Sequence, residues 1–122
     1  MTAITSGGQP QKIFVVFPCY NEEEGLEKLL SRVQRVAAIS GFPVQLVIID
    51  DGSTDHTTQV ARSFCETLPI HIIRFENNKG VVEGFNIAFA YVLKESHDQD
   101  IIVTIDADNT MNPYVILDFL ER

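Results

Sequence analysis

Residues 44–55, with the sequence VQLVIIDDGSTD, decide the fold of this chain. Val44–Ile49 is a short, nearly continuous apolar run rich in Val and Ile. Such a run is typical of a strand covered on both faces in a parallel sheet. It stops abruptly at Asp50, Asp51 and Gly52, which do not suit an apolar core. The segment therefore predicts a buried parallel strand that opens into a polar loop at its carboxyl end.

The same pattern recurs along the chain. Further apolar runs occupy Ile13–Phe17, Ile70–Phe75 and Ile101–Ile105. Between the runs, apolar residues recur three and four positions apart, as on one face of a helix. These stripes are Leu26, Leu29, Leu30, Val33, Val36 and Ala37; Val60, Ala61, Phe64, Cys65 and Leu68; and Phe85, Ala88, Phe89, Val92 and Leu93. A fourth helix is expected to begin at Pro113. The alternation predicts an α/β, Rossmann-like fold: a parallel sheet of about four strands, connected βαβαβαβα and flanked by helices.

Composition limits the organisation and the partners. Residues 1–11 are small and polar and are expected to form a disordered lead-in, followed by one domain over residues 12–122. The net charge of −8 argues against nucleic acid and against an anionic membrane surface. No apolar run approaches the roughly 20 residues that cross a bilayer. We therefore expect a cytoplasmic protein in which Cys19 and Cys65 are free thiols.

In an open parallel sheet, ligands bind beyond the carboxyl ends of the strands. The polar segments expected there are Pro18–Glu24, Asp50–Asp55, Glu76–Gly80 and Asp106–Thr110. Part of this polarity has a purely structural explanation. Asn21 can cap a helix with Glu24 as its partner, and one of residues 53–55 can cap the next. Asn78, Lys79 and Gly80 make a good turn in any protein.

Caps and turns do not explain the paired carboxylates. Asp50 and Asp51 repel one another and are costly to bury unless donors or a cation meet them. A carboxylate in this place can accept the ring N–H of uracil or guanine. Asp106 and Asp108, one residue apart at a strand end, are oxygen ligands of the kind that Mg²⁺ or Mn²⁺ prefers. Lys79 could supply a positive charge for a phosphate.

Together these motifs carry a family resemblance. In order and in spacing, Pro18–Glu23, Asp50–Asp55, Asn78–Gly80 with Asn86, and Asp106–Asp108 resemble the family 2 glycosyltransferases of the GT-A fold. The resemblance covers residues 12–122. Among members of that family, the polyprenyl-phosphate sugar transferases are the type that we suggest. The chain then corresponds to the N-terminal, nucleotide-sugar-binding half of such an enzyme.

The resemblance implies a donor site for a UDP- or GDP-sugar. Pro18, Tyr20 and Glu22 would border the base and ribose, and Asp51 would read the base edge. Lys79 and Gly80 would lie near the nucleotide. Asp106 would lie near the ribose or the metal, and Asp108 would hold the Mg²⁺ or Mn²⁺ that bridges the diphosphate. These roles follow from the resemblance and not from composition or spacing.

The chain departs from the family pattern in its length. Members that invert configuration carry a catalytic base and an acceptor site after the Asp-x-Asp motif, and this chain ends at Arg122. No general base can be named in this chain. His56, His71 and His97 are each expected to be structural or surface residues. The acceptor stays open among a sugar, a polysaccharide and a polyprenyl phosphate. A chain of this length is expected to be inactive alone, to form homo-oligomers through an exposed apolar edge, and to reach the cytoplasmic face of a membrane only through a missing part. The alternative is a non-catalytic nucleotide-binding or regulatory module.

Overall fold

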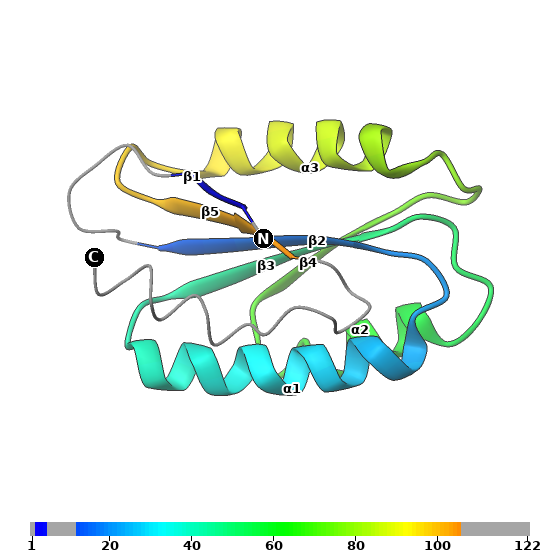
Figure 1. The fold of residues 1–122 in the computed structure, drawn as a ribbon, viewed down its shortest axis with the longest axis horizontal. Helices are drawn as coiled ribbons and strands as arrows, with labels where there is room; N and C mark the ends of the chain where they lie inside the picture. The colour runs from blue at the N-terminus through cyan, green and yellow to red at the C-terminus, as the bar shows by residue number, and fades with distance from the viewer. Residues whose placement is uncertain (1, 5–11, 106–122) are drawn as a thin grey trace.

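The computed structural model describes residues 2–4 and 12–105, which form a five-stranded sheet between helices on its two faces (Figure 1). The elements are, in chain order, β1 (Thr2–Ile4), β2 (Ile13–Cys19), α1 (Glu23–Ser40), β3 (Val44–Asp50), α2 (Thr57–Ser63), β4 (Ile70–Arg74), α3 (Val81–Glu95) and β5 (Ile101–Thr104). The strand order is β1-β5-β2-β3-β4. Strands β5, β2, β3 and β4 run parallel. The predicted four-strand parallel sheet with flanking helices is confirmed.

The first residues differ from the expected lead-in. Thr2–Ile4 form β1, which pairs antiparallel with β5 so that Thr2 lies opposite Thr104 and Ile4 opposite Ile102. A strand at the edge of a sheet presents a row of unpaired N–H and C=O groups, and β1 provides partners for that row of β5. The expectation of disorder is therefore wrong for residues 2–4. Residues 5–11 and the helix expected at Pro113 lie outside the described residues.

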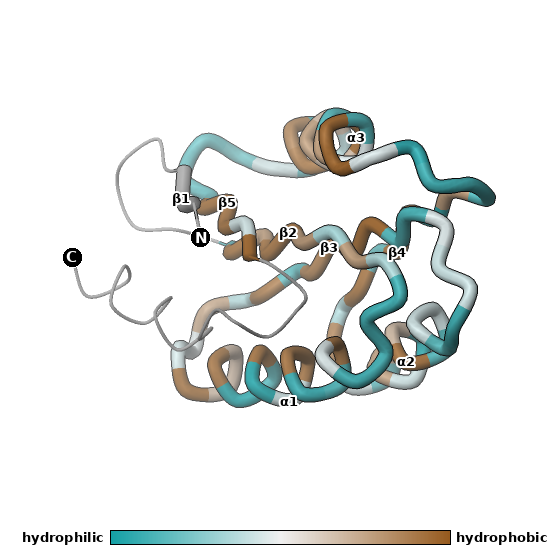
Figure 2. Tube along the Cα trace, turned by 45° about the vertical axis from the view of Figure 1, so that its right-hand side comes forward, coloured by the Kyte–Doolittle hydropathy of each residue, from teal (hydrophilic) through white to brown (hydrophobic). Residues whose placement is uncertain are grey.

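Alternation along β2 builds the core on both faces of the sheet. Ile13, Val15 and Phe17 are fully buried on the face covered by α1 and α2. Phe14 and Val16 are buried on the face covered by α3. Figure 2 shows the resulting pattern, with hydrophobic strands inside and hydrophilic loops at the sheet end where α1 and α3 begin. No helix within the described residues combines the length and the apolar character needed to cross a membrane.

Two residues of the predicted apolar stripes do not face the core. Cys65 is exposed, because α2 ends at Ser63 and the chain continues through the tighter bonds Phe64 N–H to Ala61 C=O and Cys65 N–H to Arg62 C=O. Leu93 is 69% exposed. In α3 the residues buried against the sheet are Gly84, Ala88 and Val92, which recur every four positions, and Leu93 lies beside that line.

Gly52 allows two loops to touch at the carboxyl end of the sheet. Its φ is +80°, and a Cβ atom there would lie 2.8 Å from the backbone nitrogen of Asn78 and 2.9 Å from the carbonyl carbon of Asn77. Both neighbours are backbone atoms, so they cannot rotate away as a side chain would. The β3–α2 loop therefore packs directly on the β4–α3 loop, and only glycine fits between them.

This contact predicts unequal costs for two glycine substitutions. Gly41, which follows α1, has a φ of +72° and no atom within 4 Å of an added Cβ. We expect Gly41→Ala to lower the free energy of unfolding by about 1 kcal/mol, the cost of a left-handed backbone alone. Gly52→Ala should lower it by about 3 kcal/mol, because the loops must also separate. Urea denaturation measures both, and equal losses would contradict the close contact.

Candidate functional site

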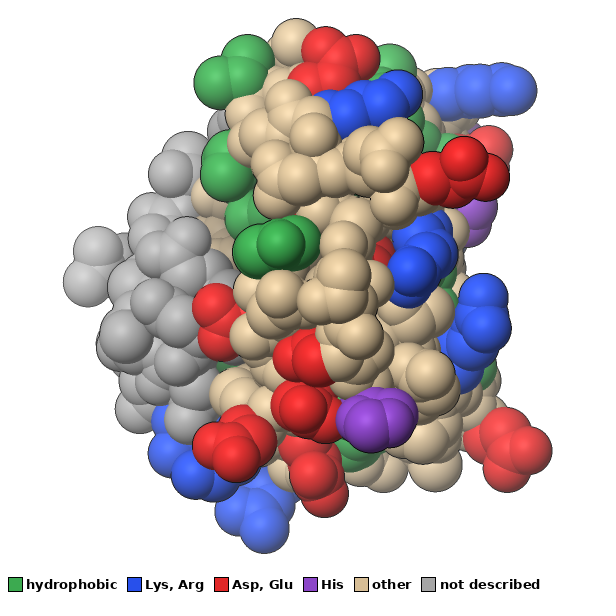
Figure 3. Space-filling view, turned by 90° about the vertical axis from the view of Figure 1, so that its right-hand side faces the viewer, with side chains coloured by type: hydrophobic (Ala, Val, Ile, Leu, Met, Phe, Trp, Pro, Cys, Tyr) green, Lys and Arg blue, Asp and Glu red, His purple; other side chains and the backbone are tan. Residues whose placement is uncertain are grey.

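The candidate site lies at the carboxyl ends of the parallel strands. Strands β3 and β4, the next two after β2 in the chain, lie on one side of β2, and β5 lies on its other side. Helices α1 and α2 cover one face of the sheet and α3 covers the other (Figure 1). The ends of β2 and β5 therefore form the topological switch point at which open α/β sheets bind ligands. Figure 3 looks onto this edge and shows acidic side chains gathered in its lower half.

Asp50 and Asp51 point to opposite faces of the sheet. They are 1% and 6% exposed. Successive side chains along a strand alternate between faces, so Asp50 continues the row of Ile48 toward α2 and Asp51 the row of Ile49 toward α3. Each carboxylate meets its own set of donors. Donors of the protein thus meet both buried carboxylates, as the cost of burying such a pair leads one to expect.

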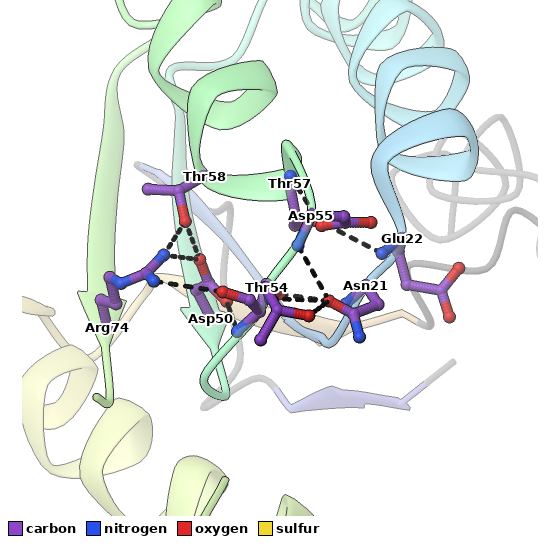
Figure 4. A network of polar contacts seen from close by, with 9 residues as sticks. Asn21, Glu22, Asp50, Thr54, Asp55, Thr57, Thr58 and Arg74 are labelled. Carbon is purple, nitrogen blue, oxygen red and sulfur yellow. Dashed lines mark hydrogen bonds and ion pairs between the residues drawn. The ribbon is translucent and has the colours of Figure 1, made fainter. Parts of the chain in front are cut away.

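Asp50 is neutralised within the protein. Its Oδ2 lies 2.9 Å from Nη1 of Arg74, and its Oδ1 accepts the backbone N–H of Ser53 at 3.0 Å. Thr58 donates its hydroxyl to the same carboxylate, and Arg74 also bonds Thr58 and the carbonyl of Ser53 (Figure 4). Arg74 was not among the residues predicted from the sequence. Arg74 is the one Lys or Arg residue in the third apolar run, which could have marked it as a partner for a strand-end carboxylate. In the structure the parallel register places it opposite Asp50.

Asp51 lies just after β3 and bonds to the last residue of β2 and to the loop after β4. Its Oδ1 accepts the N–H of Lys79 at 2.6 Å, and its Oδ2 accepts that of Gly80 at 2.9 Å. Its own N–H donates to the carbonyl of Cys19 at 3.0 Å. A carboxylate offers about four lone-pair positions, and these two bonds occupy two. Asp51 therefore keeps acceptor capacity for a ligand while its position is fixed from both sides.

The other predicted nucleotide contacts lie along the same edge. Pro18 is half-buried near the end of β2, Tyr20 is 46% exposed, and Glu22 is half-buried before α1. The Nζ atom of Lys79 lies 4.9 Å from the centroid of the Phe75 ring, a cation–π distance. The described residues that were expected to contact a nucleotide thus share one edge of the sheet. Their roles toward a nucleotide stay predictions.

The expected metal ligands Asp106 and Asp108 lie outside the described residues. The last described residue is Ile105, whose N–H donates to the carbonyl of Val16 at 3.1 Å. Within residues 2–4 and 12–105, no group of three or more His, Cys, Asp or Glu side chains is placed to hold a metal ion. Asp50 is engaged by the guanidinium of Arg74, which repels a further cation. The role of Asp106 and Asp108 as metal ligands stays a prediction.

Asn21 does not cap α1 as expected. Its Oδ1 instead accepts the backbone N–H of Thr54 at 2.8 Å and of Asp55 at 3.3 Å (Figure 4). Its own N–H donates to Oγ of Ser53 at 3.0 Å. The expected cap of the next helix is met in part, because Oδ1 of Asp55 accepts the N–H of Thr57, the first residue of α2, at 2.9 Å. Asn21 therefore links the β2–α1 loop to the β3–α2 loop and does not cap α1.

The environment shifts two pKa values at this edge. Burial raises the pKa of the Cys19 thiol far above its ordinary value, and the carboxylates of Asp50, Glu22, Asp55 and Asp51 raise it further, so Cys19 stays a neutral thiol. For Asp55, burial acts to raise the pKa, but hydrogen bonds from Thr57 and from the backbone N–H of Glu23 outweigh it. The pKa of Asp55 is therefore lowered.

Comparison with known families finds one matching model for nearly the whole chain. The model for glycosyl transferase family 2 matches residues 14–122. Among curated proteins, the chain is 34% identical over 114 residues to the dolichol-phosphate mannosyltransferase of Pyrococcus furiosus, an alignment that covers 90% of this chain and 29% of that protein. The chain spans about a third of the length of the curated relatives it matches.

Solved structures of this type share the fold. The structure of S. aureus TarS residues 1–349 with UDP-GlcNAc has a TM-score of 0.71 and 26% identity, over 90% of this chain and 30% of that one. Glucosyl-3-phosphoglycerate synthase from Mycobacterium tuberculosis, with Mn²⁺, UDP and glucosyl-3-phosphoglycerate, has a TM-score of 0.62 and 25% identity, over 87% of this chain and 37% of that one. The expected GT-A fold is confirmed.

The lowered pKa of Asp55 predicts a pH-dependent contribution to stability. Since the folded-state pKa lies below the ordinary 3.8, the ionised group stabilises the fold at pH above 3.8 and loses this effect as the pH falls through the lowered value. Asp55→Asn keeps an oxygen acceptor but removes the charge. We expect the variant to be less stable than the wild type at neutral pH, and urea titrations should show the gap closing below about pH 4. A gap that stays constant on acidification would contradict this role.

Proposed function

The chain belongs to glycosyl transferase family 2, and from this membership we propose that it forms the donor-binding part of a metal-dependent glycosyltransferase. The observation that carries the proposal is that Asp51, at the end of β3, bonds both to the last residue of β2 and to the loop after β4. A donor site needs an edge that holds a base, a ribose and a diphosphate in sequence. The carboxyl edge of this sheet offers groups suited to each of these parts.

Asp51 is proposed to recognise the base. Its two oxygens are fixed by the N–H groups of Lys79 and Gly80, so the remaining lone pairs have a set direction. A carboxylate in this state accepts the ring N–H of uracil or guanine. Tyr20, which is 46% exposed, and Pro18 provide apolar surface beside the base. Glu22, which follows on the same loop, is proposed to meet the ribose hydroxyls.

The diphosphate is proposed to lie toward Asp106 and Asp108. These residues would hold Mg²⁺ or Mn²⁺, which when bound offsets the charge that develops on the leaving diphosphate. The M. tuberculosis structure is a complex with both Mn²⁺ and UDP, which supports this choice of ion. Lys79 is exposed and carries the positive charge of the β4–α3 loop, so it can approach a phosphate once it leaves the ring of Phe75.

The whole protein is proposed to transfer a sugar to a polyprenyl phosphate. The support is the name of the P. furiosus relative, a dolichol-phosphate mannosyltransferase. The described residues contribute the donor end of this reaction. We propose no general base among them, because His56, His71 and His97 have the structural settings expected of them: His56 pairs with Glu23, His71 stacks on Tyr91, and His97 follows α3.

Metal-dependent nucleotide binding tests the proposal directly. We expect isothermal titration of the chain with UDP to show an affinity at least about tenfold higher with Mn²⁺ than without it. Asp108→Asn should abolish this dependence while thermal stability holds or rises, because a cluster of carboxylates loses one repulsive charge. The matched control is Asp98→Asn, an exposed aspartate before β5 at the opposite edge, which should leave binding unchanged. A folded wild-type chain that binds UDP neither with nor without Mn²⁺ would overturn the proposed function.

Base recognition by Asp51 makes a separate prediction. Asp51→Asn removes the charge and replaces one acceptor with a donor, so the affinity for UDP should fall by about tenfold or more. The loss should be the same with and without Mn²⁺. Binding of pyrophosphate with Mn²⁺ should fall much less, because Asp51 is proposed to contact the base and reaches the diphosphate end only through the loop of Lys79. Circular dichroism establishes that the variant is folded, and an equal loss of pyrophosphate binding would contradict the assignment.

A further inference from the structure

Asn21 has an unusual backbone and a central place between two loops. Among the described residues it alone, apart from glycines, has a positive φ, at 51°. Asparagine tolerates this left-handed region better than most residues, but the conformation persists only where the surroundings enforce it. Here the enforcing contacts come from the β3–α2 loop, more than 30 positions away in the sequence. The conformation therefore serves the pairing of two loops.

The two loops exchange acceptors in both directions. From the first loop, Oδ1 of Asn21 accepts the N–H groups of Thr54 and Asp55. From the second, Oγ1 of Thr57 accepts the N–H of Glu22 at 2.9 Å, and Oδ2 of Asp55 accepts the N–H of Glu23 at 3.4 Å. The bonds that the N–H groups of Glu22 and Glu23 donate are half-buried, and those that Thr54 and Asp55 donate to Asn21 are exposed. A shift of either loop would break these bonds in both directions.

The positions next to Asn21 give this pairing a functional meaning. Tyr20 and Glu22, the proposed contacts of the base and ribose, flank it directly in the sequence. The partner loop begins at Asp51, two residues before Ser53, which accepts the N–H of Asn21. The oxygen of Asn21 is occupied by the partner loop, so it is not offered to a ligand. The oxygen of Asn21 can therefore act on a nucleotide only through the neighbouring residues that it positions.

We propose that Asn21 is a positioning residue for the donor nucleotide, which fixes Tyr20 and Glu22 relative to Asp51. This inference rests on the proposed function. Preorganisation of a binding site reduces the entropy lost when the ligand orders it. Asn21 provides such order through two backbone N–H groups and its own amide, without touching the ligand. Its removal should therefore weaken recognition of the nucleoside and spare the diphosphate end.

A set of substitutions at one position separates strain from hydrogen bonding. Asn21→Gly permits the positive φ but lacks the acceptor, and we expect its affinity for UDP with Mn²⁺ to fall by about tenfold. Its affinity for pyrophosphate with Mn²⁺ should stay within about twofold of the wild type. Asn21→Asp keeps an oxygen acceptor and should recover most of the lost affinity. The matched control is Thr54→Ala, which removes only a hydroxyl bonded to Asn21 at 3.4 Å and should bind as the wild type does.

Each outcome bears on the inference. If the Asn21→Gly variant binds UDP as tightly as the wild type, the inference is overturned, because the hydrogen bonds of Asn21 are then not needed to position the two loops. An equal loss of UDP and pyrophosphate binding also overturns it, because the role is then one of general folding. The proposed function is tested separately, with the wild-type chain alone. If the wild type binds UDP more tightly with Mn²⁺ than without it, the proposed function is supported whatever the variants do.

Discussion

Two adjacent carboxylates at the end of a buried strand impose the constraint on which the rest of this edge depends. Burying an ionised carboxylate without partners costs several kcal/mol, so Asp50 and Asp51 must each be met by donors. Because strand residues alternate, the donors lie on opposite faces: Arg74 on one, and the amides of Lys79 and Gly80 on the other. The ion pair and hydrogen bonds of these two carboxylates therefore fix the loops around β3.

The loops also hold one another. Gly52 brings the β3–α2 loop against the β4–α3 loop, and Asn21 fastens the β2–α1 loop to the same segment. Most of these contacts join a side-chain acceptor to a backbone N–H, which sets direction as well as distance. The edge is therefore ordered by the protein's own polar groups, although its residues are drawn from loops, the parts of a fold that usually move most.

The sequence predicts the parts of this arrangement that depend on local patterns better than those that depend on contacts between distant segments of the chain. Apolar runs such as Val44–Ile49 predict strands, because burial on both faces is written in the residues themselves. The apolar residues of α1 likewise predict a helix, because their spacing shows which face is buried. Cys65 and Leu93 were misplaced because a stripe does not tell where a helix ends or which line of residues meets the sheet. Asn21 has the local pattern of a helix cap, and only the packing of a distant loop reveals its actual partners. The antiparallel pairing of residues 2–4 has no signal in so short a segment.

The division of labour at the site follows from the same contacts. Base recognition is assigned to Asp51, which the protein holds in place through Lys79, Gly80 and the backbone of Cys19. Diphosphate binding is proposed for Asp106 and Asp108, two carboxylates that would need a cation to meet a diphosphate. Neither buried carboxylate depends on a metal ion, because Asp50 has Arg74 as its counter-charge and Asp51 accepts the N–H groups of Lys79 and Gly80. The proposed base-binding end is thereby ordered by the protein's own polar groups, and a metal ion is required only for the proposed diphosphate end.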